Sequence, residues 1–254
     1  MSAPSPLSRR LRLDQSGVAM LEFALSLPIV LALGLYGVEI SNLALANLKL
    51  SQIALALADN ASRVGVANQL AQQQLREFDI NDVLQAARLQ GEDLKLTANG
   101  RITLSSLEES GGVQRIHWQR CIGLQKGAGY DSSYGRTTIK GGTPSTANDT
   151  GASYDPTAGI NTKTDGTDDS ASHPGSVITG GMGDPNQKVM APKDSGVMFV
   201  EVNYKYVPVT GTWLLGPQRL YSVASFIVRD RRTFTVVSNP SPAVKRSTCD
   251  LYTN

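Results

Sequence analysis

The chain has 254 residues, of which 41% are hydrophobic and 18% charged, and its formal net charge is +2. Before Gly17, this excess is already supplied by Arg9, Arg10 and Arg12 against Asp14, so the rest of the chain is neutral overall. The balance argues against a basic nucleic-acid-binding surface, and no nucleic-acid partner is expected. A short basic block directly before an apolar run is the charge layout of a segment that inserts in a membrane with its N-terminus in the cytoplasm.

An apolar run follows the basic block. From Phe23 to Val38 the residues carry no charge, and Ser26 is the single polar side chain. Extending the run to 18–40 gives about 35 Å of helix, which is enough for a bilayer core of about 30 Å. The extension includes Glu22 and Glu39, and a carboxylate at the centre of a bilayer costs on the order of 2.5 to 3.5 kcal/mol. An acid in this position is therefore a hypothesis of function by default.

The first half of the chain is predicted to be mainly helical. A Leu- and Ala-rich pattern that reaches the stop signals near position 60 predicts one long helix over 18–60, kinked at Pro28. A second helix is predicted over 68–89. Alternating residues on either side of Asn99-Gly100, a hairpin dipeptide, then predict two strands.

The second half is predicted to hold more strands, so the fold class is α+β. Strand patterns occupy 113–124, 196–209 and 218–237, which gives an antiparallel sheet of about four or five strands. Residues 123–187 hold 13 of the 24 glycines and almost no Leu, Ile, Val or Phe. Such a segment buries too little apolar surface to offset its ordering entropy, and we expect a long loop or disordered insertion there.

Cleavage of the chain after Gly17 would give Glu22 a role. Val18 would then carry a free ammonium group, and Glu22 would be the fifth residue of the product. Opposite charges four residues apart face each other on one helical turn, or the amine of one chain pairs with the carboxylate of a neighbour. Subunits packed side by side in this way neutralise two costly charges at once.

The segment RLRLDQSGVAMLEF resembles a class III prepilin signal, with a basic leader, Gly17 before the scissile bond, and Glu22 followed by Phe23. Together with EFALSLPIVLALGLYGVEISN it resembles the TadE-like pilus assembly proteins of the tight-adherence (Flp pilus) system, which are pseudopilins. The matching positions are Glu22, Phe23, Ala24, Leu27, Pro28, Gly37 and Glu39. The resemblance covers residues 9 to about 60, and VEVNYKYVPV and ASFIVRD look like the family's terminal strands. A TadG-like minor component is the alternative within the same system.

The resemblance implies a pilus assembly protein of the bacterial inner membrane, single-pass, with a cytoplasmic N-terminus and a periplasmic C-terminal domain. It implies processing by a prepilin peptidase between Gly17 and Val18, and contacts with lipid, with other pilus subunits and with the inner-membrane assembly platform. Glu22 would pair charges during assembly. Phe23 would serve peptidase recognition or simply face lipid.

Five segments are expected on this basis. They are a leader at 1–17, a transmembrane and amphipathic helix at 18–60, a helix with the first strands at 61–122, the glycine-rich insertion at 123–187 and the C-terminal strands at 188–254.

The two cysteines, Cys121 and Cys249, form no CxxC pair, so a zinc site is not indicated. In an exported compartment two lone cysteines tend to pair, and such a bridge would stabilise the fold by roughly 4 to 5 kcal/mol. Two buried free thiols are the alternative.

Two other interpretations of the N-terminus and of the chain's function stay open. A conventional signal peptide would be cut near LALA at 43–46, although its apolar region is long for that class. An uncut signal anchor would leave the chain as a membrane-tethered periplasmic binding module. Both leave Glu22 without a role.

Catalytic, cofactor and metal sites are not indicated, and we expect a protein that is not an enzyme. The histidines, His117 and His173, belong to no catalytic motif, and His117 is expected on a sheet surface. The acidic segment at 165–170 lacks the spacing of a calcium loop, and Ser132 replaces the third glycine of a dinucleotide-binding pattern. The large aromatics Trp118, Tyr204, Tyr206 and Trp213 are expected in the core or on a sheet face, and VRDRR at 228–232 on a strand edge.

Overall fold

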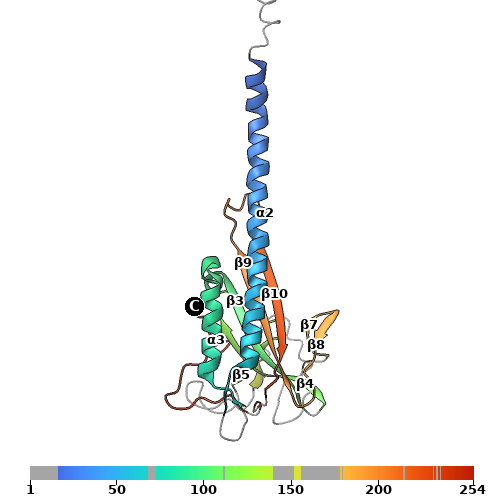
Figure 1. The fold of residues 1–254 in the computed structure, drawn as a ribbon, viewed down its shortest axis with the longest axis vertical. Coiled ribbons are helices and arrows are strands. Elements are labelled where there is room, and N and C mark those ends of the chain that lie inside the picture. The colour runs from blue at the N-terminus through green and yellow to red at the C-terminus, as the bar shows by residue number, and fades with distance from the viewer. Residues whose placement is uncertain are drawn as a thin grey trace, which may run out of the picture. The chain divides into compact units, whose positions relative to one another are not determined.

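The fold is described by a computed structural model, drawn in Figure 1. It covers residues 17–67, 73–110, 112–139, 152–155, 178, 180–213, 215–230, 232, 234 and 236–254. The chain divides into two compact units. The first holds the N-terminal part up to Ala44 together with Val207–Gly216, and the second holds Leu45–Tyr206 and Pro217–Asn254.

Helix α2, Val18–Arg63, is 46 residues long and continues through Pro28 without a break. Leu and Ala favour the helix. Pro28 has no backbone N–H, so the carbonyl of Ala24 loses only the one helical hydrogen bond that it would otherwise accept. The helix ends three residues beyond the predicted end. Its last turn is extended by Arg63, whose guanidinium lies 2.8 Å from the carboxylate of Asp59 one turn earlier.

Helix α3 covers Glu77–Gln90, so the helix expected over 68–89 begins later than predicted. Gln73–Gln74 instead form strand β2, which pairs with strand β1, Val66–Ala67. The start of α3 is fixed by Asp79, which accepts hydrogen bonds from the backbone N–H of Arg76 at 3.2 Å and from its guanidinium at 2.7 Å. An acid in the first turn also complements the positive end of the helix dipole.

The expected hairpin at Asn99-Gly100 is wrong. A short helix η1, Glu92–Leu94, and helix α4, Leu96–Asn99, come before Gly100, where strand β3 begins. Gly100 has an extended backbone, with φ of −149°. A Cβ atom there would lie 2.5 Å from the carbonyl oxygen of Asn203, so the glycine serves a close approach between strands and not a turn.

The second unit is built around a four-stranded antiparallel sheet, in the order β10-β9-β3-β4. The strands are β3, Gly100–Ser110; β4, Val113–Ile122; β9, Gly196–Tyr206; and β10, Gln218–Ile227. The α+β prediction is confirmed at this level. The β3–β4 connection passes through Gly112, whose positive φ of 81° suits a tight turn.

One face of this sheet is covered by the second half of α2 and by α3 (Figure 1). Ser222 of β10 donates a hydrogen bond to Ser51 of α2 at 3.3 Å, and Arg120 of β4 bonds to Glu77 of α3. Because side chains alternate along a strand, the residues in register with Ser222 and Arg120 point to this same face. The apolar residues buried in this layer include Leu50, Ile53, Leu57, Ile80, Leu84, Ile102, Leu104, Val200 and Val202. Burial of each large side chain stabilises the layer by about 1.5–3 kcal/mol.

The opposite face of the sheet is partly covered by the region expected as a loop or disordered insertion. There the structure differs from the prediction, because strand β5, Arg136–Ile139, pairs with β6, Ala152–Asp155, and β7, Met182–Asp184, pairs with β8, Gln187–Val189. The apolar residues Tyr134, Ile178 and Met182 of this region pack against the sheet. They form one buried cluster with Leu107, Ile116, Ala191, Val197 and Phe199. Residues 140–151 and 156–177, with His173 and the acidic segment at 165–170, lie outside the described residues.

Three smaller expectations also need correction. His117 is buried, and its ring Nδ1 lies 2.6 Å from the carboxylate of Glu108. Trp213 is 69% exposed, whereas Trp118 and the two expected tyrosines are buried. Arg232 lies outside the named strands, in an isolated bridge to Gln73 of β2. It is buried, and its guanidinium donates to the carbonyls of Ala61 at 3.2 Å and Val64 at 2.5 Å, where α2 leaves acceptors unsatisfied.

Candidate functional site

The helix begins at the residue that follows Gly17. The carbonyl of Gly17 accepts the first helical hydrogen bond, from the N–H of Leu21 at 3.0 Å. A Cβ atom placed on Gly17 meets nothing within 4 Å, so the described structure does not itself require glycine here. The residues expected to form the leader, before Gly17, lie outside the described residues.

The predicted charge-pairing residues lie on an open helix surface. Val18 is 46% and Phe23 63% exposed, and Glu22 is exposed one turn after Val18. Within the described residues, Glu22 makes no ion pair. Position and spacing allow a carboxylate at Glu22 to meet a cation on Val18 or on a neighbouring helix.

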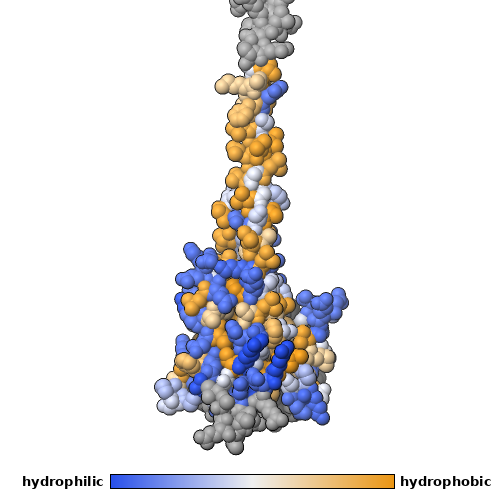
Figure 2. Space-filling view, in the orientation of Figure 1, coloured by the Kyte–Doolittle hydropathy of each residue, from blue (hydrophilic) through white to orange (hydrophobic). Residues whose placement is uncertain are grey.

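The first half of α2 is apolar on all sides. In its most apolar window of 18 residues none is buried, and Figure 2 shows this stretch as an almost continuous hydrophobic surface. Within the described part of the chain, α2 is the one helix that is long and apolar enough to cross a membrane. A helix that is apolar all round needs a nonpolar environment such as lipid or other helices.

A second acid of α2, Glu39, organises a contact inside the first unit. Its carboxylate accepts hydrogen bonds from the backbone N–H of Val209 at 3.3 Å, and from both the backbone N–H and the hydroxyl of Thr210, at 3.0 and 2.8 Å. Glu39 has no exposed surface. Hydrogen bonds to a charged group stabilise by about 1.5–3 kcal/mol each, and together they offset the cost of burying this carboxylate.

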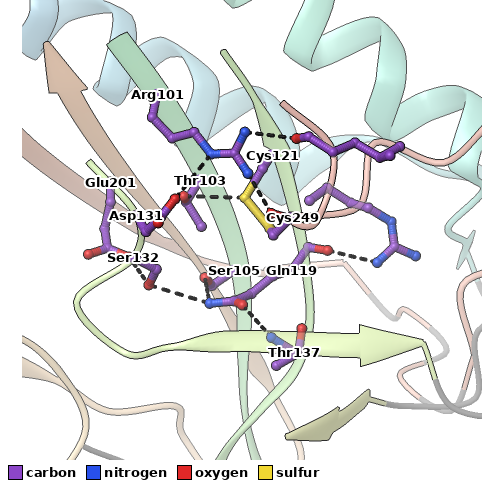
Figure 3. The surroundings of a disulfide bond; sticks show 12 residues. Arg101, Thr103, Ser105, Gln119, Cys121, Asp131, Ser132, Thr137, Glu201 and Cys249 are labelled. Atoms are coloured by element: carbon purple, nitrogen blue, oxygen red, sulfur yellow. Dashed lines mark hydrogen bonds and ion pairs between the residues drawn. A yellow bond between two sulfur atoms is a disulfide. The ribbon is translucent and has the colours of Figure 1, made fainter. Parts of the chain in front are cut away.

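The disulfide joins Cys121 of β4 to Cys249 near the C-terminal end of the described chain, with a sequence separation of 128 residues (Figure 3). The segment around Cys249 runs alongside β4. The N–H of Cys121 donates to the carbonyl of Ser247 at 2.7 Å, and the N–H of Gly123 donates to that of Thr253 at 2.7 Å. The covalent link and these hydrogen bonds hold the C-terminal segment against the edge of the sheet.

Arg101, the second residue of β3, anchors the same segment. Its guanidinium donates to the carbonyls of Cys249 at 2.6 Å and Leu251 at 2.8 Å, and its charge faces the ring of Tyr252 at 4.2 Å. Burial lowers the pKa of Arg101, while Tyr252 and Asp131 favour its charged form. The arginine satisfies backbone carbonyls that would otherwise be buried without donors.

Next to the disulfide lies a buried polar network that includes Glu201 of β9 (Figure 3). Its carboxylate accepts hydrogen bonds from the hydroxyl of Ser132 at 2.5 Å and from the N–H of Ser133 at 3.0 Å. Burial raises the pKa of Glu201, and these hydrogen bonds oppose that shift. The cavity beside the disulfide, lined by Ser132 among others, measures about 10 Å³, which is room for no more than one water.

A buried ionic cluster connects α3 to the sheet. Glu77, at the first position of α3, bonds to Arg120 of β4 at 2.9 Å and to Arg246 of the C-terminal segment at 2.9 Å. All three side chains are at most 2% exposed. The cluster ties the helix, the sheet edge and the C-terminal segment together.

Among the described residues, no group of three or more His, Cys, Asp or Glu side chains could hold a metal ion. The buried pair of His117 and Glu108 lies in the β3–β4 ladder, where the hydroxyl of Ser106 also donates to Glu108 at 2.6 Å.

Comparison with known proteins found no matching family model, no matching curated protein and no matching solved structure.

Sequence reasoning singled out Gly17, Glu22, Phe23 and the two cysteines, and the structure places them at two separate locations. The first three lie at the start of α2, and the cysteines lie in the sheet unit. It missed the role of Glu39, whose position at the end of the apolar run was the available signal. It also missed Arg101 and Glu77, which no local pattern distinguishes from surface charges.

Proposed function

We propose that this chain is a minor pseudopilin or assembly component of a tight-adherence (Flp, type IVc-like) pilus, inserted in the bacterial inner membrane and processed by a prepilin peptidase. The observation that carries the proposal is the start of α2. A basic block, Gly17 and, five residues later, Glu22 precede an apolar helix segment that is unburied along its length. The resemblance to TadE-like proteins in the same residues supports it.

The mechanism follows from the spacing of the charges. Cleavage after Gly17 would create an ammonium on Val18 beside Glu22, or within reach of Glu22 on a neighbouring helix. A carboxylate at the centre of a bilayer costs on the order of 2.5 to 3.5 kcal/mol. Pairing with the ammonium group neutralises the carboxylate and lowers this cost. Helices that pair in this way would add to an assembly from within the membrane.

Replacing Gly17 by alanine is expected to leave the leader attached to most of the chains. The peptidase must accept the backbone next to the scissile bond, whereas the helix itself tolerates a Cβ atom at this position. N-terminal sequencing of membrane-extracted protein should give Val18 for the native chain and Met1 for the variant.

The matched control is Gly34→Ala, at a glycine inside α2 that has free space around it, as Gly17 does. This variant should still begin at Val18. A native chain that begins at Met1 would favour an uncut anchor and a tethered binding module, and one that begins at Asn47 would favour an ordinary signal peptide.

Glu22→Gln is expected to spare cleavage but to reduce pilus assembly severely, because the substitution keeps the shape and removes the charge. Surface pili are counted by electron microscopy, and processing is checked by mass spectrometry. Glu92→Gln, at an exposed position of η1, is the control and should assemble normally. Pili at the native level in the Glu22 variant would remove charge pairing from the mechanism.

A further inference from the structure

The loop between β9 and β10 is an uncharged, largely apolar segment. Residues 207–216 read VPVTGTWLLG and contain no ionisable side chain. Val207, Val209 and Trp213 are 55%, 77% and 69% exposed. Exposed apolar side chains gathered in one short loop mark a surface that contacts a nonpolar partner.

The position of this loop on α2 matches the edge of a membrane. The loop belongs to the same compact unit as the apolar half of the helix, and Val209 and Thr210 bind it to Glu39. Glu39 is the residue directly after the apolar run. From Val18 to Glu39 the helix rises roughly 32 Å, against a hydrocarbon core of about 30 Å. If Val18 lies at one edge of the core, Glu39 and the loop lie at the other.

Trp213 has the geometry of an interfacial tryptophan. Its indole N–H donates to the carbonyl of Thr210 at 2.7 Å, so the ring can enter a less polar region with its hydrogen bond already made. Gly211, with φ of 90°, provides the turn under the ring. Tyr36, one turn before Glu39, is 46% exposed. Trp and Tyr are enriched where a protein crosses the headgroup region.

We propose that the β9–β10 loop is a membrane-surface anchor in which Trp213 and Val209 contact lipid at the leaflet where α2 leaves the bilayer. Glu39 holds the loop at that depth. The inference rests on the membrane insertion in the proposed function. A lipid surface fits this loop better than a second protein, because the loop carries no charge for selective recognition and its tether fixes its distance from the apolar run.

The test uses the full chain reconstituted in phosphatidylcholine and phosphatidylglycerol vesicles, with Trp118→Phe leaving Trp213 as the single tryptophan. The lipid carries bromine either near the glycerol end or near the terminal methyl of the acyl chain. We expect a blue shift of Trp213 emission, strong quenching by the shallow bromine, and weaker quenching by the deep bromine and by aqueous acrylamide. If the Trp118 variant fails to fold, the difference between the native chain and Trp213→Phe gives the same signal.

The control variants examine the tether. Glu39→Ala should lose most of the shallow quenching, whereas Ser41→Ala should retain it, because the Ser41 hydroxyl bonds to the carbonyl of Gly37 within its own helix. Acrylamide quenching without bromine quenching would overturn the anchor, and protection from both quenchers would show that protein covers the loop instead.

Flotation of the vesicles separates the anchor proposal from the proposed membrane insertion. A chain that floats with Trp213 unquenched contradicts the anchor alone, and a chain that does not float contradicts membrane insertion.

Discussion

Replacing Glu77 by alanine is expected to destabilise the sheet unit by about 3–5 kcal/mol. Glu77 is the acid that Arg120 and Arg246 share, and both guanidinium groups are at most 2% exposed on their side chains. Removal of the acid leaves two cations facing each other inside the fold, without the charge that offsets their desolvation. The first turn of α3 also loses an acid at the positive end of its dipole.

The free energy of unfolding is measured by denaturant titration of the detergent-solubilised full chain. The fluorescence of Trp118 is expected to change on unfolding, because the side chain is buried and its ring lies 5.7 Å from the guanidinium of Arg120. Glu92→Ala removes an exposed acid and should change stability by less than about 1 kcal/mol. A similarly small change in the Glu77 variant would mean that the cluster contributes little to the fold.

Removal of the disulfide, by replacing both Cys121 and Cys249 with alanine, is expected to cost about 5 kcal/mol on the chain-entropy account. The bridge closes a loop of 128 residues, and without it the unfolded chain gains the freedom of that whole loop. This decrease in the free energy of unfolding should be close to the largest found on removal of a single native disulfide.

The same titration, with and without a reducing agent, measures this effect. The reduced native chain should match the double variant, and the reducing agent should leave the double variant unchanged. Equal stability of the oxidised and reduced native chains would show that Arg101 and the backbone hydrogen bonds hold the C-terminal segment without the bridge.

Features determined by local sequence were predicted well. The start of α2 at Val18 follows from its composition, and the strand patterns at 113–124, 196–209 and 218–237 each gave a strand of the sheet. The α+β class could be predicted for the same reason, because periodicity is a short-range property.

The late start of α3 is a local error, since Asp79 fixes it through Arg76 three residues away. The other errors concern contacts between residues far apart in sequence. Gly100 was interpreted as a turn residue, but the reason for the glycine is the carbonyl of Asn203 on another strand. The glycine-rich segment contributes Ile178 and Met182 to a cluster that only the folded sheet completes. Glu39 binds a loop about 170 residues further along the chain, and no local pattern predicts such a partner.

The close approach of backbones at Gly100 limits which residues this position can hold. The Cβ atom of any other residue at Gly123 would lie 2.3 Å from the carbonyl oxygen of Gly100, just as one at Gly100 would strike Asn203. Strands β3 and β9 and the residue directly after β4 thus meet at a place where main chain packs on main chain. Side chains elsewhere in the sheet can be exchanged for others of similar volume, but here no substitution by a larger residue has a compensating neighbour. A side chain at either glycine would therefore force the backbone itself to shift, and we expect such substitutions to be tolerated far less than changes in the apolar layer.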